Sequence, residues 1–539
     1  MVTKRTAGVG ISTGAMVLVG LIVPATVAGP AHAGGGPTPG TFTWERCPVK
    51  EAPTARCGRI ILPRDYSRPN GRTVALAAAK VPATGVKRGT LFFNPGGPGE
   101  SGVNLVTSGI AAILPASVRR HFDFISWDPR GVGLSRPAIQ GCQPTAPQPS
   151  PLPTTGLPTR SQWFSLLSQF RSRFRNAARQ CLPQNLGIAP YMGTNNVVRD
   201  LDMMRRAVGD DKLTFWGASY GSRIGYVYAL RYPDRLRAIL LDGPVDPRRG
   251  YRDFARVRAQ ATDRALTVMA TPQVRPGFAA EIIATRDDLR INGPVAVPGT
   301  EGQLDQWTFQ RYVAQQTSAQ SQWTKIQELI DAIDQVRNPK VEAADEQASD
   351  EVRDVIEEVA EDDPFSPQIG NGGKGADDAA NRGMANRIIN YLDYADGDIP
   401  VEVARRILLN NVRNFPFNAA NTAGLLPNAA GLTSLEPDPI PLTRTPRFAR
   451  IARAAENVLI SGSTGDGATP APWMAQMAAS FRRAGLVRFD GWQHVNWINV
   501  ESSCVNDPIT DFIVTGTKPD PNRPPLCPFA PPAPPESPL

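Results

Sequence analysis

The hydrophobic positions of this chain fall into short apolar runs separated by turn residues and amphipathic stretches. Before residue 247, the apolar runs predict strands at residues 59–63, 73–81, 89–93, 122–127, 213–216 and 237–242. Helical spacing of apolar residues predicts helices at residues 161–180, 194–208 and 223–232. Thr194 or Asn195 is available to cap the second of these helices. Strands that alternate with helices indicate a parallel sheet wrapped by helices.

This alternation stops after residue 246 and resumes near residue 457, where a strand (457–461), a helix (469–484) and a strand (486–490) are predicted. The intervening residues have helical spacing and irregular stretches. The simplest interpretation is an α/β core in two parts, residues 34–246 and 447–517. A helical insertion at residues 247–446, longer than an ordinary connection, interrupts it. A Pro-rich tail, residues 518–539, follows.

Residues 1–33 have the layout of a secretory signal peptide. Lys4 and Arg5 form a charged start, residues 15–23 are apolar, and Ala31-His32-Ala33 is a cleavage site of the A-x-A kind. Such a short apolar run cannot span a bilayer core of about 30 Å. We therefore expect a secreted protein, cleaved near Ala33, with no stable membrane insertion.

The composition is that of an ordinary globular protein, with 41% hydrophobic and 20% charged residues. The formal net charge is +8, but the basic residues are dispersed among acids. No basic run is interleaved with aromatic residues. We therefore expect no nucleic-acid partner.

Six cysteines, an even number in an exported chain, indicate disulfides. Several pairings are possible, and the simplest joins sequence neighbours. It gives Cys47–Cys57, Cys142–Cys181 and Cys504–Cys527. The cysteine spacings resemble no zinc site, and the chain holds only three histidines, so we expect no metal.

The sequence Gly217-Ala218-Ser219-Tyr220-Gly221 lies between a predicted strand and a predicted helix. A G-x-S-x-G pattern in that setting is typical of a nucleophile elbow, where a sharp strand-to-helix turn presents the serine. The flanking glycines remove the Cβ atoms that would clash in so tight a turn. Ser219 is therefore the predicted nucleophile, and it needs a neighbouring base.

Two histidines, His121 and His494, remain after the signal peptide is removed. His121 precedes the strand at residues 122–127, at the N-terminal edge of the sheet. His494 follows the strand at residues 486–490, and catalytic groups in open α/β sheets gather at the carboxyl ends of strands. His494 is the predicted base.

Asp466 is the predicted acid of the triad, because it follows a strand and lies between the serine and the histidine in chain order. It would hold the imidazole tautomer. Asp242, at the end of the strand after the elbow, is a rival, and Asp246 is a weaker one. An Asp before Pro or Gly-Pro also organises turns. The position of Asp466 in the strand–loop unit nearest His494 favours it.

An oxyanion hole needs backbone N–H groups aimed at the developing charge. One is expected from Tyr220, the residue after the nucleophile, and the other from the loop at residues 94–102. Gly97 is the expected donor there, supported by Gly96, because glycine allows close approach of the backbone to the substrate.

Three motifs together resemble the secreted tripeptidyl aminopeptidase group of α/β-hydrolases, which is related to prolyl aminopeptidases. They are Asn94-Pro-Gly-Gly-Pro-Gly, the segment Trp127-Asp-Pro-Arg-Gly-Val-Gly-Leu-Ser135, and the elbow. Residues 241–247, residues 466–470 and the pair Cys504 and Cys527 fit the same group. The resemblance implies an α/β-hydrolase fold whose insertion caps the active site. It also implies a triad of Ser219, Asp466 and His494, and release of short peptides such as tripeptides from free N-termini, without a cofactor.

Two residues depart from this family pattern. Gln493 stands before His494 where glycine is usual, and Glu100 stands directly after Pro95-Gly-Gly-Pro-Gly99 where a small residue is usual. A protonated substrate amine needs a carboxylate in a partly desolvated pocket, and Glu100 is a candidate. Residues 342–363 supply rival carboxylates, although their spacing is that of an amphipathic helix with a solvated acidic face. Four aromatic residues of the insertion are candidate pocket or core residues: Trp307, Trp323, Tyr391 and Tyr394.

The residue patterns predict an exported serine hydrolase, and the resemblance implies an exopeptidase that acts on the N-termini of peptides or proteins. An exported carboxylesterase or lipase would use the same triad. A non-catalytic binding protein on this fold is the alternative from another class.

Overall fold

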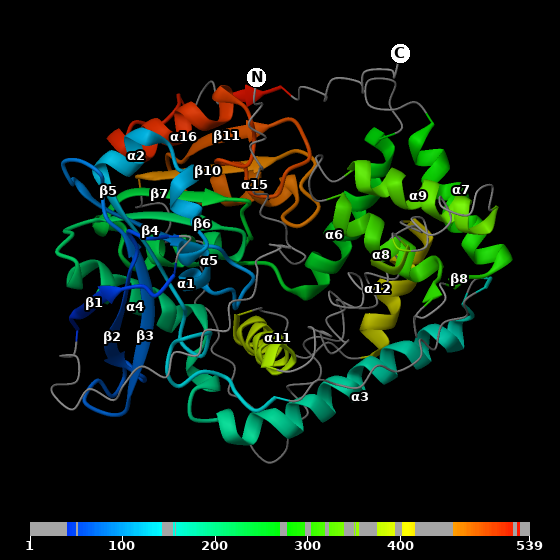
Figure 1. The fold of residues 1–539 in the computed structure, drawn as a ribbon, viewed down its shortest axis with the longest axis horizontal. Coiled ribbons are helices and arrows are strands. Elements are labelled where there is room, and N and C mark those ends of the chain that lie inside the picture. The colour runs from blue at the N-terminus through cyan, green and yellow to red at the C-terminus, as the bar shows by residue number, and fades with distance from the viewer. Residues whose placement is uncertain are drawn as a thin grey trace.

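A mostly parallel sheet of ten strands forms the centre of the core in this computed structural model (Figure 1). The strands are β1 (Phe42–Arg46), β2 (Arg56–Pro63), β3 (Thr73–Val81), β4 (Gly89–Asn94), β5 (Phe122–Trp127), β6 (Leu213–Ala218), β7 (Leu236–Asp242), β10 (Val458–Ser463), β11 (Gly485–Phe489) and β12 (Leu526–Cys527). Their order is β1-β2-β3-β5-β4-β6-β7-β10-β11-β12. The pairings from β1 to β5 are antiparallel and the rest are parallel. The predicted fold class is confirmed.

The structure describes residues 40–49, 52–142, 155–156, 158–269, 277–296, 303–317, 323–338, 350, 352–354, 374–393, 401–414, 456–520 and 525–528. The signal peptide at residues 1–33 lies outside them, as do most of the acidic stretch 342–363 and residues 529–539 of the tail. In the described part of the chain, no helix is long and apolar enough to cross a membrane.

Helices cover both faces of the sheet (Figure 1). One face carries α4 (Thr194–Ala207), α5 (Tyr220–Arg231) and α15 (Ala471–Ala478), and the other carries α1 (Gly102–Thr107), α2 (Ala116–His121) and α16 (Ser503–Thr515). The central strand β6 is buried along its whole length. Its neighbouring residues Phe215 and Trp216 enter opposite hydrophobic clusters, as the two-residue period of a strand requires.

A further group of helices packs against the core, and Met384, Ile388 and Leu392 of one of them belong to the core cluster itself. The group comprises α6 (Tyr251–Met269), α7 (Phe278–Asn292), α8 (Gln306–Gln316), α9 (Trp323–Arg337), α11 (Lys374–Asp393) and α12 (Val401–Asn414), with the short strands β8 (Val295–Ala296) and β9 (Gln303–Leu304). The long helix α3 (Arg160–Asn185) contacts α12, and Trp163 packs edge-on against Trp307 at 5.5 Å between ring centroids. The helical layer therefore draws on a segment before the elbow as well as on the predicted insertion at residues 247–446.

Two local expectations differ from the structure. The helix predicted at residues 469–484 spans only Ala471–Ala478, and Phe481, beyond its end, packs edge-on against Tyr226 in the core. Neither Thr194 nor Asn195 caps α4 with its side chain: Gly193 is the N-cap residue, and the Thr194 N–H donates to the distant Asp393 carboxylate at 2.9 Å. A contact across the fold thus replaces the expected local cap.

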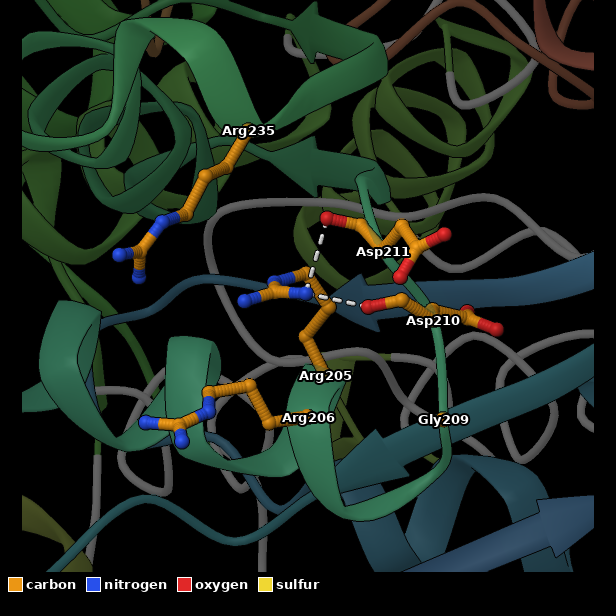
Figure 2. A pocket seen from close by; sticks show the side chains of 6 residues that line it. All are labelled: Arg205, Arg206, Gly209, Asp210, Asp211 and Arg235. Carbon is orange, nitrogen blue, oxygen red and sulfur yellow. Dashed lines mark hydrogen bonds between the residues drawn. The ribbon is translucent and has the colours of Figure 1, made fainter.

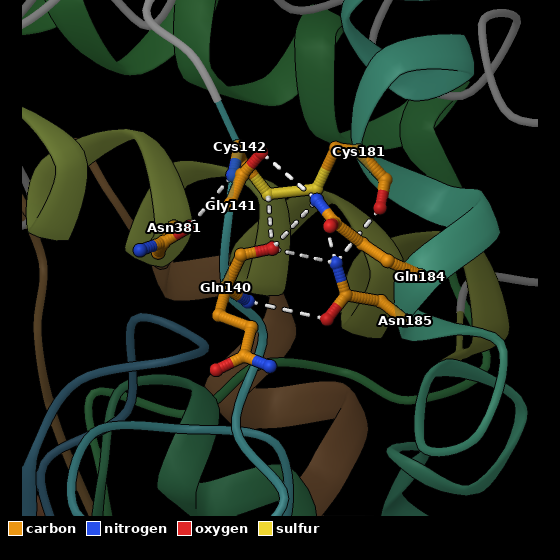
Figure 3. Close-up of a disulfide and its surroundings, with 7 residues drawn as sticks. All are labelled: Gln140, Gly141, Cys142, Cys181, Gln184, Asn185 and Asn381. Atoms are coloured by element: carbon orange, nitrogen blue, oxygen red, sulfur yellow. Dashed lines mark hydrogen bonds between the residues drawn. A yellow bond between two sulfur atoms is a disulfide. The ribbon is translucent and has the colours of Figure 1, made fainter.

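Three disulfides join Cys47 to Cys57, Cys142 to Cys181 and Cys504 to Cys527, which is the pairing of sequence neighbours. Figure 3 shows the second of them between the segment after β5 and helix α3.

Candidate active site

Ser219 occupies the turn between β6 and α5. Its φ of 53° is positive, which is uncommon for a residue with a side chain and is the geometry of a nucleophile elbow. A Cβ on Gly221 would lie 2.3 Å from the Asn94 carbonyl oxygen, so only glycine fits where α5 passes the end of β4. The local sequence thus makes the turn that presents the serine.

The structure brings His494 and Asp466 together in the interior. The imidazole Nδ1 lies 2.8 Å from Asp466 Oδ2 and 3.1 Å from Oδ1, and both side chains are buried. Asp466 also accepts the N–H groups of Ala468 and Thr469 at 2.8 Å and the Thr469 hydroxyl at 2.6 Å. These donors fix the carboxylate, and the carboxylate orients the ring.

His494 and Ser219 both adjoin the end of β7. The Ser219 N–H donates to the Asp242 carbonyl at 2.8 Å, and a Cβ on Gly243 would lie 3.1 Å from His494 Cε1. The Nε2 atom of His494 is buried and has no hydrogen-bond partner among the described residues. This nitrogen is therefore available to a hydroxyl proton, as the base of a triad requires.

Asp242, the rival acid, holds the loop after the histidine. Its carboxylate accepts the N–H groups of Asn496 and Trp497 at 2.9 Å each, and burial raises the pKa of Asp242 to about 6. Val495, between His494 and this loop, has a φ of 63°, a strained value for a β-branched residue. The two hydrogen bonds help to keep the loop in that conformation.

The other rivals lie elsewhere. Asp246 forms ion pairs with Arg248 at 2.8 Å and Arg249 at 3.6 Å. His121 ends α2 at the N-terminal edge of the sheet, with Nδ1 3.1 Å from the Val86 carbonyl. The geometry therefore favours Asp466 and His494 over all three.

The loop after β4 lies against the elbow. A Cβ on Gly96, whose φ is +97°, would lie 2.8 Å from the Tyr220 nitrogen and 3.0 Å from Ser219 Cβ. The Gly96 N–H donates to Asn94 Oδ1 at 3.1 Å, and no hydrogen bond within the described ranges uses the Gly97 N–H. The arrangement leaves Gly97 and Tyr220 as the available donors, the second at a helix N-terminus.

The family model of the alpha/beta hydrolase fold matches residues 89–499, well over half of the chain. The chain belongs to the α/β-hydrolase family.

Curated relatives of this hydrolase include peptidases and an esterase. Serine protease Hip1 of Mycobacterium tuberculosis is 29% identical over 94% of each chain. Tripeptidyl aminopeptidase of Streptomyces coelicolor is 36% identical over 38% of each chain. Carboxylesterase B of Mycobacterium tuberculosis is 31% identical over 42% of this chain and 45% of its own. These relatives confirm the resemblance to peptidases of this family and support a serine hydrolase.

Glu100 of the hydrolase stands beside the oxyanion loop. Its Cγ would lie 3.0 Å from a Cβ placed on Gly97. Glu100 is exposed to solvent, yet the protein atoms around its carboxyl raise its pKa by desolvation, while the charge of Arg382 opposes that rise. A carboxylate in such a place gains from a cationic ligand, because the ligand replaces lost hydration.

Three of the four candidate aromatic residues of the insertion are buried in packing contacts, as core residues would be. Trp307 packs against Trp163, Tyr391 lies in the core cluster, and Tyr394 lies outside the described residues. Trp323 packs against Trp492 at 5.7 Å between centroids. That contact joins α9 to the segment two residues before His494.

A cavity of about 530 Å³ lies at the opposite end of β6 (Figure 2). It is lined by Arg205, Arg206, Gly209, Asp210, Asp211 and Arg235. Figure 2 shows the Arg205 guanidinium hydrogen-bonded to the backbone carbonyls of Asp210 and Asp211, which precede the strand. Active sites in α/β sheets lie at the carboxyl ends of strands, so this cavity is not the active site. Within the described ranges, no cluster of three or more His, Cys, Asp or Glu residues could hold a metal ion.

Asp393 and the side chain of Tyr220 were missed by the sequence interpretation. Asp393, at the end of α11, accepts the Tyr220 hydroxyl. Its position in the sequence carries no pattern that would single it out among the acids of the insertion.

Proposed function

We propose that this protein is an exported serine exopeptidase that removes short peptides, such as tripeptides, from free N-termini. The proposed triad is Ser219, His494 and Asp466, with the N–H groups of Gly97 and Tyr220 as the oxyanion hole. The relatives named serine protease and tripeptidyl aminopeptidase support a peptidase. The observation that carries the exopeptidase proposal is the Glu100 carboxylate beside the oxyanion loop.

The chemistry follows from these roles. Ser219 Oγ attacks the scissile carbonyl while His494 Nε2 takes the hydroxyl proton, and Asp466 stabilises the imidazolium. The negative charge on the tetrahedral oxygen is met by the two backbone N–H groups. His494 then donates its proton to the leaving amine. The N-terminal peptide remains esterified to the serine as an acyl-enzyme. Water, activated by the same imidazole, hydrolyses this acyl-enzyme.

Glu100 would bind the substrate α-ammonium group and so fix the number of residues between the N-terminus and the scissile bond. The carboxylate is already partly desolvated, which strengthens its pairing with an ammonium group. An acetylated N-terminus has no positive charge and would lose this contact.

The decisive experiment compares a chromogenic tripeptide with a free N-terminus, its acetylated form and a short-chain ester. We expect the free amine to be preferred, and Glu100→Gln to raise KM for that substrate alone. Glu402→Gln, an exposed carboxylate on α12 that pairs with Arg405, is the matched control. Equal hydrolysis of the free and acetylated peptides would rule out the amine anchor.

The relative named carboxylesterase B supports an esterase as the second candidate. Hydrolysis of the ester alone would establish it. No hydrolysis of any substrate, with no labelling of Ser219 by a fluorophosphonate probe, would favour the binding protein.

Export is supported by the signal-like residues 1–33 and by the three disulfides, which persist in oxidising compartments. Mass spectrometry of the protein from culture medium should find a mature N-terminus near Gly34. An uncleaved chain retained in the cytoplasm would overturn this proposal.

A further inference from the structure

Helix α11 contacts both segments that carry the proposed oxyanion donors. Figure 1 shows it almost end-on between the sheet and the other helices of the insertion. Its last residue, Asp393, reaches the elbow, and Asn386, about two turns earlier, reaches the loop after β4. One helix of the insertion therefore adjoins both sides of the proposed hole.

The Asp393 side chain is 3% exposed, and its partners lie in the core. It accepts the Tyr220 hydroxyl, the Thr194 hydroxyl at 2.6 Å and the Thr194 N–H at 2.9 Å. The Thr194 and Tyr220 hydroxyls are 2.7 Å apart, and Arg223 donates to the Asp393 carbonyl. The carboxylate thus ties the end of α11 to the starts of α4 and α5.

The electrostatics favour this arrangement. Burial and the Asp393 charge raise the pKa of Tyr220 well above its usual value, so the phenol stays protonated and donates. A hydrogen bond from a neutral hydroxyl to a buried carboxylate is among the stronger kinds. The negative charge also lies at the N-terminus of α4, where the helix dipole stabilises it.

The second contact is with the loop. Asn386 Nδ2 donates to the Pro98 carbonyl at 2.7 Å, directly after Gly97. A Cβ on Gly99 would lie 3.3 Å from the Asn386 nitrogen, so the loop lies close to the helix backbone. The Pro98 carbonyl cannot move without breaking the contact.

We propose that α11 is a clamp on the oxyanion hole, in which Asp393 positions Tyr220 and Asn386 positions the loop that carries Gly97. Both are positioning residues, because they act through the proposed donors rather than on the substrate. The inference rests on the proposed assignment of Gly97 and Tyr220. It means that the insertion contributes to the chemical step and not only to substrate selection.

The test uses Tyr220→Phe, Asp393→Asn and the double variant in the full-length mature protein. Tyr220→Phe keeps the backbone N–H and the ring and removes only the clamped hydroxyl. Asn381→Ala is the matched control on the same helix, because Asn381 Oδ1 accepts the Cys142 N–H, away from the hole (Figure 3). Rates are measured per site titrated with a fluorophosphonate, so unfolded protein does not count.

We expect kcat for both the ester and the free-amine tripeptide to fall about 10- to 100-fold in each single variant, because small displacements of catalytic groups cost that much. KM should change far less. Inhibition by a peptide aldehyde, which forms a tetrahedral adduct, should weaken by the same factor as kcat/KM. The double variant should lose no more than Asp393→Asn, because the two groups act as one unit. Asn381→Ala should retain kcat even if it lowers the melting temperature.

An unchanged kcat per titrated site in Tyr220→Phe would overturn the clamp, as would equal losses in Asn381→Ala. If Asp393→Asn does not fold, the kcat per titrated site of Tyr220→Phe is the deciding measurement. Failure of the proposed function is separable: wild-type protein that hydrolyses the ester but not the peptide refutes the exopeptidase and leaves the clamp testable on the ester. Absence of fluorophosphonate labelling in wild-type protein refutes the triad and, with it, the clamp.

Discussion

Two buried aspartates flank the catalytic histidine candidate and have different partners. Asp466 contacts the imidazole Nδ1, whereas Asp242 receives the backbone N–H groups of Asn496 and Trp497. Asp242 ends β7 and Asp466 follows β10, its neighbour in the sheet, so their chain positions alone left them as rivals. The partner atoms distinguish a residue that orients a ring from one that holds a loop.

Asp466→Asn should reduce kcat by about 10⁴-fold, because an amide in place of the carboxylate no longer stabilises the imidazolium or selects its tautomer. The melting temperature should change only slightly. Steady-state kinetics on the tripeptide and thermal unfolding measure the two effects. A variant with near-normal kcat would return the role to Asp242.

Asp242 should make stability depend on pH. Its pKa is about 6 in the folded protein against 3.8 as the ordinary value, so the folded state binds the proton more tightly. The stability that the neutral carboxyl contributes is therefore lost as pH rises between these values. From pH 4 to pH 7 the free energy of unfolding of the wild type should fall, relative to Asp242→Asn, by on the order of 2 kcal/mol. Denaturant titrations at both pH values measure it, and a constant difference would contradict the expectation.

At the scale of elements, the elbow and the loop after β4 meet because β4 and β6 are parallel neighbours whose carboxyl ends coincide. Asn94 pairs with Gly217 in that register. Both the strand positions and the glycine-rich loops were predicted, since short apolar runs and G-x-S-x-G carry their signal locally. The capping of α4 was not, because its partner arrives from α11.

Gly96→Ala should disable the active site. The added Cβ would lie 2.6 Å from the Ala218 carbonyl and 2.8 Å from the Tyr220 nitrogen, and the φ of +97° disfavours any side chain. Displacement of the loop should lower kcat about 100-fold. Gly209→Ala is the control: its φ is +84°, but nothing lies within 4 Å of the new atom. It should cost about 1–2 kcal/mol of stability and leave kcat intact. Equal kinetics in both variants would count against the close approach.

At the scale of the whole molecule, the C-terminal segment is held to the core by the Cys504–Cys527 disulfide. The bond closes 23 residues and joins α16 to β12 at the sheet edge. This edge lies four strands from β6 in the sheet, so its contribution should be to stability.

Replacing both cysteines with alanine should lower the free energy of unfolding by about 3 kcal/mol, since a cross-link restricts the unfolded chain. Denaturant unfolding measures the loss, and kcat per titrated site should be retained. A fall in kcat without a loss of stability would show instead that the disulfide serves the active site.

The sequence by itself determined the fold class, eight of the ten strands of the sheet and the sharp turn at Ser219, and it supplied the proposed order of serine, acid and histidine. Those features depend on periodicity and on residues within a few positions of one another. Only the tertiary structure decided which aspartate contacts His494, what caps α4, and which side chains hold Tyr220. Asp393 and Tyr220 are 173 residues apart. Their hydrogen bond depends on how α11 packs against the core, and no local pattern records that geometry.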